Sequence, residues 1–294
     1  MPLDSPLPPP LPRFDAGCLH TLAYGALTER DVSELHALKR QIQDSIGFQC
    51  DGYKEKCLRR RIAVRMRARG VHSYARYAEL LGDDAEEHRR LAEAMTINVS
   101  KFFRNREVWE VVRATVLPAL LERGFREIRI WSAGCAAGEE AYSIAMLVLE
   151  LASERGIDPR RFKITGTDID RTTLDLARQG EYPEYAFGEI DPTMRERWFE
   201  GADLRRVRPD LRRIVRFEPL DLIADAFAGG QHLIFCRNVI IYFERRIQED
   251  LFGRFRAALT PGGFMVLGKV ETLFGAHGRT FHPIAARERV FQKP

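Results

Sequence analysis

The sequence lacks every feature that would place this chain in a membrane. None of its apolar stretches approaches the roughly 20 residues that a membrane-spanning helix needs. The amino terminus has no positively charged segment followed by an apolar core. With 294 residues, 45% hydrophobic and 30% charged, the chain is long enough for one large α/β domain and a smaller domain. We therefore expect a cytoplasmic protein without membrane insertion.

Cysteine is scarce and unpatterned. The five cysteines are odd in number and show no C-x-x-C spacing; they are Cys18, Cys50, Cys57, Cys135 and Cys236. A disulfide framework and a zinc site both require closely spaced or paired cysteines. We expect free thiols and no metal site.

Phosphate-binding loops are also missing. The sequence contains no G-x-x-x-x-G-K-[ST] motif, and the spacing of Gly134 and Gly138 departs from G-x-G-x-x-G. Glu139 and Glu140 follow these glycines and would repel a pyrophosphate. Dinucleotides and nucleoside triphosphates are therefore disfavoured. S-adenosylmethionine carries a sulfonium and an α-ammonium instead of phosphate, so an acidic first helical turn is compatible with it.

The most informative segment present is residues 128–140, where an apolar strand breaks at two glycines and a long helical pattern follows, residues 139–151. Such glycines let backbone approach a ligand at the helix amino end, although many α/β proteins use them only to turn the chain. A second strand, residues 162–167, ends at Asp168. An acid there can accept hydrogen bonds from two ribose hydroxyls. Together these features predict an adenosine-containing cofactor.

Four segments follow from the patterning. Residues 1–20 form a proline-rich flexible tail, and residues 21–97 are helical throughout. Residues 98–126 join this helical domain to an α/β domain at 127–294, whose short apolar strands alternate with helices as in a doubly wound Rossmann-like sheet. Within it, about 185–218, two β-compatible runs, 204–207 and 211–217, predict a small antiparallel insertion.

One helix is strongly basic. Eight of the residues from Lys54 to Arg69 are lysine or arginine and only Glu55 opposes them. Leu58, Ile62 and Met66 would seat this helix, and Arg61, Arg65 and Arg69 would form a neighbouring stripe. Such a face suits nucleic acid or an acidic protein surface. Without interleaved aromatic residues to stack bases, an acidic protein helix is favoured and nucleic acid is not.

Three ordered motifs carry a resemblance to a known family: Ile97-Asn98-Val99-Ser100-Lys101-Phe102-Phe103-Arg104, the glycine segment 131–144, and the segment 234–243 that includes Arg237, Asn238 and Tyr242. The chain resembles the chemotaxis receptor glutamate O-methyltransferases, the CheR family, over roughly residues 28–290. The resemblance implies methyl transfer from S-adenosylmethionine to glutamate side chains of chemoreceptors.

The resemblance also implies site residues. Catalytic roles fall to Arg104 and Tyr242, Arg104 holding the incoming carboxylate and Tyr242 positioning it or the sulfonium methyl. Serine replaces the more usual threonine at Ser100, and the family often has asparagine where this chain has Asp221. The implied cofactor contacts are Asn98, Ser100, Arg104, Glu140, Asp168, Asp221, Leu222, Arg237 and Asn238. The implied partners are the cytoplasmic methylation helices of chemoreceptors, contacted through residues 54–69.

Two other classes remain as alternatives. A nucleic-acid or amine N-methyltransferase would normally show [ND]-P-P-[FYW] after the fourth strand, where this chain has Arg237-Asn238-Val239-Ile240. A cofactor-sensing module without catalysis would lose Arg104 or Tyr242, and both are present.

Some relatives also grip a pentapeptide at the receptor carboxyl terminus through a glycine-rich loop in the β insertion. Here the segment 198–204 has one glycine, Gly201. Because a peptide added to a strand edge needs close backbone approach, we expect no dependence on that pentapeptide.

Overall fold

The computed structural model describes residues 16–96 and 100–294 and divides the chain into two compact units at Met95 and Thr96. Helix α1 (Ala16–Tyr24) is the first described element, so the predicted end of the tail at residue 20 is wrong. Residues 98–126 are assigned to the second unit, and those that the structure describes belong to its core, not to a separate linker. Asn98 lies outside the described residues.

The first unit is helical, as its sequence pattern predicts. It contains α1, α2 (Glu29–Ile46), η1 (Cys50–Gly52), α3 (Glu55–Ala68), α4 (Tyr74–Asp83) and α5 (Ala85–Met95). Thr28 caps α2 through a reciprocal hydrogen bond with Asp31, and Gly47 ends it in the left-handed conformation that glycine favours. Leu35, Leu38 and Ile42 are buried along one face.

Several arginines of the basic helix α3 are structural. Arg59 is buried and donates to the carbonyls of Thr21, Leu22 and Gly25, which tie α3 to α1. Arg65 donates two hydrogen bonds, 3.0 and 2.8 Å long, to the fully buried carboxylate of Glu87 on α5. Arg61 donates to the carbonyl of Ala94. Arg61 and Arg65 are therefore bonded within the first unit, and the prediction that they form part of an exposed basic stripe is wrong.

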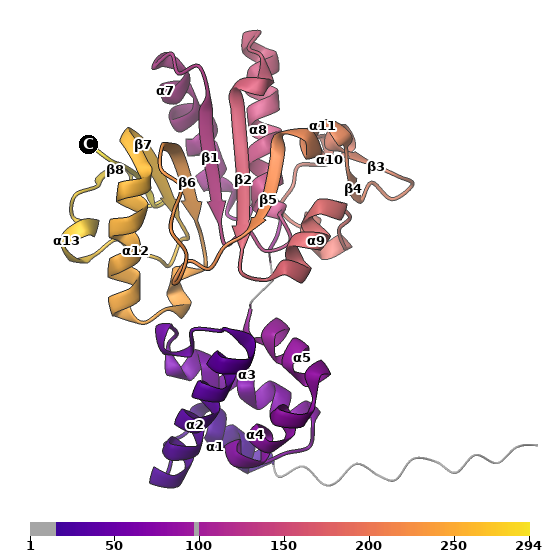
Figure 1. Cartoon of the computed structure of the whole chain (residues 1–294). Coiled ribbons are helices and arrows are strands. Elements are labelled where there is room, and N and C mark those ends of the chain that lie inside the picture. The colour runs from indigo at the N-terminus through magenta and orange to yellow at the C-terminus, as the bar shows by residue number, and fades with distance from the viewer. Residues whose placement is uncertain (1–15, 97–99) are drawn as a thin grey trace, which may run out of the picture. The chain divides into compact units, whose positions relative to one another are not determined.

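The second unit is built on a seven-stranded sheet with the order β5-β2-β1-β6-β7-β9-β8 (Figure 1). Its first five strands pair in parallel and its last two pairings are antiparallel. The strands are β1 (Ile128–Ala133), β2 (Phe162–Asp168), β5 (Val215–Pro219), β6 (Gln231–Cys236), β7 (Leu259–Leu267), β8 (His282–Ala285) and β9 (Val290–Gln292). The two strands located from the sequence are confirmed as β1 and β2, and the doubly wound fold with them.

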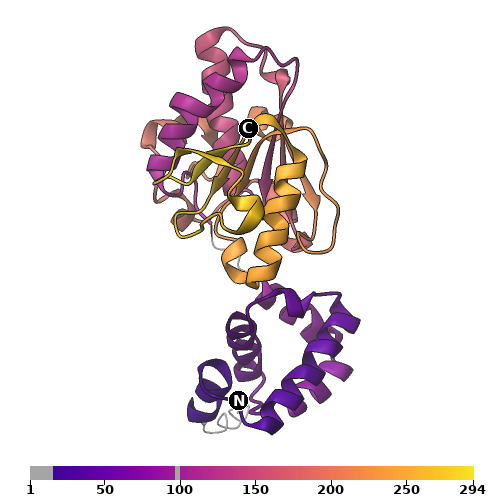
Figure 2. The ribbon, with the colours of Figure 1, turned by 90° about the vertical axis from the view of Figure 1, so that its left-hand side faces the viewer.

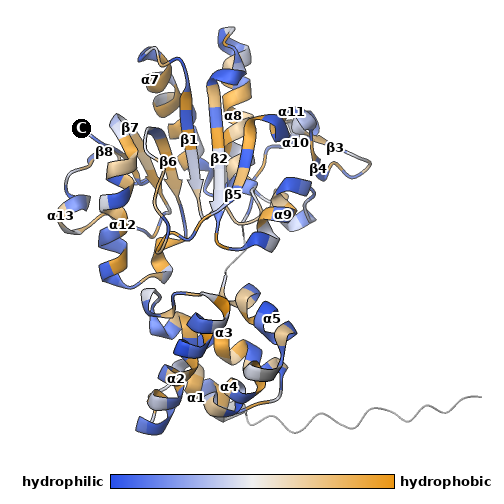
Figure 3. Ribbon diagram, in the orientation of Figure 1, coloured by the Kyte–Doolittle hydropathy of each residue, from blue (hydrophilic) through white to orange (hydrophobic). Residues whose placement is uncertain are grey.

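Helices cover both faces of the sheet, as Figures 1 and 2 show together. α8 (Glu139–Arg155) packs on β1, β2 and β5, and α12 (Arg245–Ala258) packs on β7 from the other side. In Figure 3 the strands β6 and β7 are mostly hydrophobic, whereas α9 (Arg171–Gln179) is mostly hydrophilic. This contrast follows from burial, because a parallel strand is covered on both faces. The remaining short elements are η3 (Pro159–Arg161), η4 (Glu184–Phe187), η5 (Ile240–Tyr242) and α13 (Gly275–Gly278).

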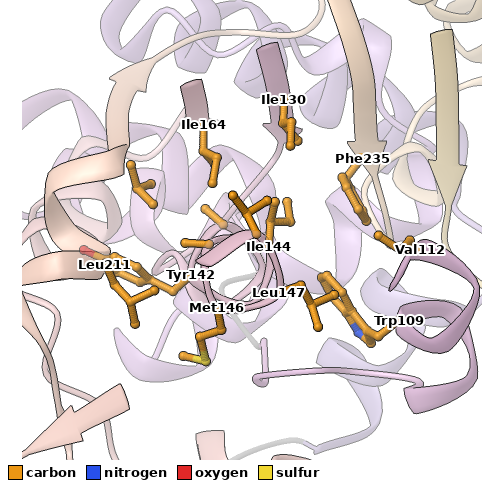
Figure 4. Packing of buried hydrophobic residues seen from close by; sticks show 14 of the residues in the cluster. Trp109, Val112, Ile130, Tyr142, Ile144, Met146, Leu147, Ile164, Leu211 and Phe235 are labelled. Carbon is orange, nitrogen blue, oxygen red and sulfur yellow. The ribbon is translucent and has the colours of Figure 1, made fainter. Parts of the chain in front are cut away.

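The segment before β1 completes the hydrophobic core. It forms α6 (Arg106–Val111), a π-helical turn η2 (Val112–Val116) and α7 (Leu117–Glu122). Figure 4 shows Trp109 and Val112 beside Phe235 of β6, with Leu147 of α8 close to them. Phe102 and Phe103 are also buried in this core. This packing explains why residues 100–126 fold with the second unit.

The predicted antiparallel insertion is confirmed in part. β3 (Phe199–Glu200) and β4 (Arg206–Val207) form a two-stranded antiparallel sheet after α10 (Pro192–Trp198). The second β-compatible run behaves differently, because Pro209 begins a short helix, α11 (Pro209–Ile214), and residues 215–219 join the main sheet as β5. Within residues 16–96 and 100–294, no helix is long and apolar enough to cross a membrane, and no group of three potential metal ligands occurs.

Candidate active site

A cavity of about 220 Å³ lies where β1 and β6 end and the chain turns toward helices. Ligands bind at this edge in open parallel sheets. It brings together six of the residues named from the sequence, Ser100, Arg104, Glu140, Arg237, Asn238 and Tyr242, with Lys101, Gly134, Cys135, Ala136 and Val239 completing the lining. The tertiary structure thus unites three sequence motifs in one cavity.

The two glycines of the β1–α8 turn serve protein packing. A Cβ at Gly134 would lie 2.4 Å from a methyl group of Val239, and a Cβ at Gly138 would lie 2.8 Å from the ring of Phe217. Both glycines also have positive φ angles, 74° and 91°. Gly138 therefore leaves room for the ring of Phe217, and its expected role beside a ligand stays a prediction.

Glu140 is the buried acid of the cavity. Its carboxylate accepts a hydrogen bond from the Ser132 hydroxyl at 2.7 Å and lies 3.3 Å from Nη1 of Arg237. Burial raises the pKa of Glu140 above its usual value, although Arg237 and Ser132 oppose that shift. Its ionised form therefore has less compensation from the protein than its burial demands. A cationic ligand group would supply the missing compensation.

Arg237 is a buried positioning residue. Besides Glu140, its guanidinium donates to the Arg104 carbonyl at 2.8 Å and to the Asn105 side-chain oxygen at 3.1 Å. It also lies over the ring of Trp109. The side chain of Arg237 is only 2% exposed. Its hydrogen bonds to the Arg104 carbonyl and to Asn105 tie the segment that carries Arg104 to the end of β6.

Asp168 ends β2 and lies beside the cavity without lining it. Its carboxylate accepts hydrogen bonds from the backbone N–H groups of Ala136, at 2.9 Å, and Asp170, at 3.1 Å. Burial raises the pKa of Asp168, and these hydrogen bonds oppose that rise. Ala136 contributes to the cavity wall. Because Asp168 is hydrogen-bonded to Ala136, one residue separates its carboxylate from the cavity.

Asp221 and Leu222 are not among the residues that line the cavity. They follow Leu220, whose N–H donates to the Asp168 carbonyl, so this turn adjoins the end of β2. The Asp221 carboxylate accepts from the N–H of Ile223 at 2.8 Å, and the Leu222 carbonyl accepts from Arg254. Their predicted contact with adenine stays a prediction.

Lys101 is a cavity residue that the sequence reasoning passed over. It stands inside the recognised motif between Ser100 and Phe102, and only its position there could have drawn attention to it. Its ammonium lies 3.7 Å from the place that a Cβ would occupy at Gly188. It makes no hydrogen bond or ion pair with any residue that the structure describes.

Glu271 is a second overlooked residue, and no local signal marks it. Its buried carboxylate accepts hydrogen bonds from the backbone N–H groups of Asn238, Val239, Ile241 and Gly268, at 2.9, 3.0, 3.4 and 2.6 Å. Asn238 has a φ of 62°, which is costly for a residue with a side chain. Glu271 therefore holds the turn after β6 in the shape that presents Asn238 and Tyr242.

Comparison with known proteins agrees with this architecture. The family description "CheR methyltransferase, SAM binding domain" matches residues 98–290, and "CheR methyltransferase, all-alpha domain" matches residues 33–96. The chain belongs to the CheR methyltransferase family. The matched SAM binding domain makes this CheR methyltransferase an S-adenosylmethionine-dependent enzyme, as the sequence resemblance implies.

Individual relatives of this CheR methyltransferase match over most of their length. The chain is 33% identical to a "Chemotaxis protein methyltransferase" of Listeria innocua over 235 residues, covering 80% of this chain and 88% of the relative. It is 31% identical to the Escherichia coli K12 protein of the same name over 288 residues, covering 91% of this chain and 97% of the relative.

The residues present fit the cofactor of this family. Glu140 offers a buried carboxylate with incomplete compensation, which suits an α-ammonium. Asp168 offers a partly exposed carboxylate that suits ribose hydroxyls. The acidic first turn of α8, Glu139 and Glu140, also disfavours a phosphate-bearing nucleotide on electrostatic grounds.

Proposed function

We propose that this enzyme methylates glutamate side-chain carboxylates of bacterial chemoreceptors and so forms glutamate methyl esters. The observation that carries the proposal is the pairing of charges in the cavity. Glu140 is an acid short of cationic partners, whereas Lys101 and Arg104 have side chains that bond to no described residue. Such a site accommodates one ammonium and more than one carboxylate. The names of the relatives point to chemotaxis proteins as substrates.

The reaction requires little acid–base chemistry from the protein. When bound, S-adenosylmethionine supplies an electrophilic methyl group on a positively charged sulfur. A glutamate with a pKa near ~4.3 is already ionised at neutral pH, so the enzyme needs no general base. Its main task is to align the carboxylate oxygen with the methyl group and to exclude water, and orientation can supply ~7–11 kcal/mol.

We assign individual roles on this basis. Arg104 orients a carboxylate in the cavity through charge-assisted hydrogen bonds, and Tyr242 positions the reacting groups from the turn after β6. Glu140 would hold the cofactor ammonium and Asp168 the ribose. The supporting cofactor contacts that we carry over from the family are Asn98, Ser100, Asp221, Leu222, Arg237 and Asn238.

Tritiated methyl transfer to receptor-containing membranes tests the function. Treatment with alkali should release the label as volatile methanol, because an ester is base-labile whereas an N-methyl group is not. Glu140→Gln, which lacks the ammonium-binding carboxylate, serves as the control with little transfer. Alkali-stable label would contradict the carboxylate substrate and favour N-methylation.

We also propose that the helical unit recognises the acidic methylation helices of the receptor through α3. Among the residues that α3 leaves exposed, Lys56, Arg60, Val64 and Arg67 follow one another at spacings of four, four and three, so they form one stripe. Lys54 adds a further exposed cation at the start of the helix. This exposed basic stripe replaces the stripe predicted from sequence.

Finally, we propose that recognition does not require a carboxyl-terminal pentapeptide on the receptor. β3 and β4 are two residues each, and the turn between them has a single glycine, Gly201. The nearby charges of Arg205 and Arg206 are already paired with Asp203 and Glu181. Titration with an Asn-Trp-Glu-Thr-Phe-type peptide provides the test. Saturable micromolar binding, with slower methylation of receptors lacking that tail, would refute the idea.

A further inference from the structure

The proposed reaction brings two carboxylates into one cavity. One is the α-carboxylate of the cofactor's methionine part, and the other belongs to the glutamate that receives the methyl group. The cavity offers three cationic side chains, Lys101, Arg104 and Arg237. Arg237 is committed to Glu140, the Arg104 carbonyl and Asn105. Lys101 and Arg104 therefore remain for the two carboxylates.

The position of Glu140 distinguishes these two cations. An amino acid carries its ammonium and its carboxylate on the same carbon, so the cation that binds the carboxylate must lie near the acid that binds the ammonium. Arg104 acts electrostatically on the buried carboxylate of Glu140 and lowers its pKa, against the larger effect of burial. Arg104 thus lies within electrostatic reach of the ammonium site.

Lys101 occupies a different part of the wall. Its ammonium lies beside Gly188, which follows η4 and precedes Glu189. It shares no hydrogen bond with Glu140 or with Arg237 among the described residues, whereas Arg237 bonds both to Glu140 and to the Arg104 carbonyl. The side chain is partly exposed, so a group arriving from solvent can reach it.

We infer that Lys101 binds the carboxylate of the methyl-accepting glutamate, a role that the sequence resemblance implies for Arg104, and that Arg104 instead binds the carboxylate of the cofactor. This inference rests on the proposed function and gives the site its preference for an anionic side chain. A lysine suits this role because its single charge can hold one carboxylate oxygen on a flexible stem and leave the other oxygen free to react. A bidentate arginine would occupy both oxygens and reduce their nucleophilicity.

The experiment compares Lys101→Met with Arg104→Met in two assays. The first measures the KM for receptor membranes in the methyl-ester assay, and the second measures S-adenosylhomocysteine affinity by calorimetry. Lys101→Met should raise KM roughly three- to tenfold, an effect that weakens with added salt, and leave calorimetric affinity unchanged. Arg104→Met should weaken S-adenosylhomocysteine binding. Lys101→Arg should have a KM close to that of the unchanged enzyme because it keeps the positive charge.

Lys163→Met is the matched control, since Lys163 is an exposed lysine near the start of β2, away from the cavity. It should behave like the unchanged enzyme in both assays. An unchanged KM in Lys101→Met, or a loss of S-adenosylhomocysteine affinity equal to that of Arg104→Met, overturns the inference. If Lys101→Met is poorly folded by circular dichroism, Lys101→Gln takes its place in the same comparison. Alkali-stable product from the unchanged enzyme would instead overturn the proposed function itself.

Discussion

Two buried glutamates, one in each unit, are treated differently by their surroundings. In the helical unit, Glu87 accepts hydrogen bonds from Tyr77 at 2.6 Å and from Arg65, and Arg69 lies 3.6 Å away. Burial opposes ionisation of Glu87, but the hydrogen bonds from Arg65 and Tyr77 outweigh it and lower its pKa. In the catalytic unit, Glu140 keeps a raised pKa despite Arg237.

The difference separates a charge that serves folding from one that serves binding. Glu87 has its full set of partners before any ligand arrives, so its ion pair holds α3 against α5. Glu140 lacks part of its compensation, and a ligand ammonium can supply it. Incomplete pairing of a buried charge in a cavity therefore marks a binding site more reliably than the presence of charge alone.

The largest effect should come from breaking the satisfied pair. Glu87→Gln leaves the partly buried guanidinium of Arg65 without its counter-ion. Removal of one partner from a buried pair costs about 3–5 kcal/mol, and the partial exposure of Arg65 places the expected loss at the lower end of that range. Urea unfolding should show this loss in the free energy of unfolding. Glu79→Gln, a change in an exposed pair on α4, should barely alter the midpoint. A stability of Glu87→Gln equal to that of the unchanged protein would remove the structural role of the pair.

The next effect concerns pH and Glu139, a buried acid beside Glu140. One of its carboxylate oxygens has no hydrogen-bond partner among the described residues. Burial raises the pKa of Glu139 to about 7, and the charge of Glu140 adds to the rise. The unfolded chain releases this proton near pH ~4.3. The free energy of unfolding is therefore unaffected by this group below that pH and falls as pH rises through about 7. The total loss is at most about 3 kcal/mol.

Glu139→Gln removes this titration and sharpens the comparison with Glu87. Denaturant unfolding at pH 5 and at pH 8 should show a smaller decline for the variant than for the unchanged protein. Equal declines would mean that Glu139 does not titrate in this range.

Glu140→Gln should have a somewhat smaller effect, and this effect should appear in the affinity for S-adenosylhomocysteine. Loss of the charge that meets the cofactor ammonium should weaken S-adenosylhomocysteine binding by about 1.5–3 kcal/mol. Unfolding should change less than in Glu87→Gln, because Arg237 keeps its bonds to the Arg104 carbonyl and to Asn105. Calorimetry and urea unfolding measure the two quantities. A larger loss of stability than in Glu87→Gln would reverse the comparison.

Asp168→Ala should also weaken S-adenosylhomocysteine binding, by up to about 1.5–3 kcal/mol. Partial exposure of the side chain to water reduces the loss. The physical reason is the lost acceptor for the ribose hydroxyls. Some of the loss will reflect the freed N–H of Ala136, which Asp168 now holds. Asp168→Asn, which keeps an acceptor, should recover part of the affinity, and calorimetry showing no loss in Asp168→Ala would exclude the residue from the site.

The smallest effect belongs to the exposed basic stripe. Replacing Arg60 and Arg67 by alanine should raise the KM for receptor several-fold, because exposed pairs contribute only about 0.2–1 kcal/mol each, and salt should reduce the effect. S-adenosylhomocysteine affinity should stay constant. The control is Arg40→Ala with Arg246→Ala, two exposed arginines on α2 and α12. A loss that does not depend on salt would contradict an electrostatic docking role.

The sequence alone determined the strands β1 and β2, the cofactor class and the family. Apolar runs that end in glycine or an acid reveal β1 and β2, because a strand buried on both faces must be apolar throughout and its end faces the ligand. The motifs that contain Arg104, Glu140 and Tyr242 predicted one cavity, and the structure places these three residues together.

Only the tertiary structure decided which charges are free. Helical spacing fixes the angle between Arg60 and Arg65 around α3, but it does not say which of them faces Glu87 on another helix. The same holds for Glu271, which accepts hydrogen bonds from three backbone N–H groups of the turn after β6, those of Asn238, Val239 and Ile241, far from it in the sequence. A side chain's partner across the fold depends on how helices and strands pack, and local periodicity carries no record of that packing.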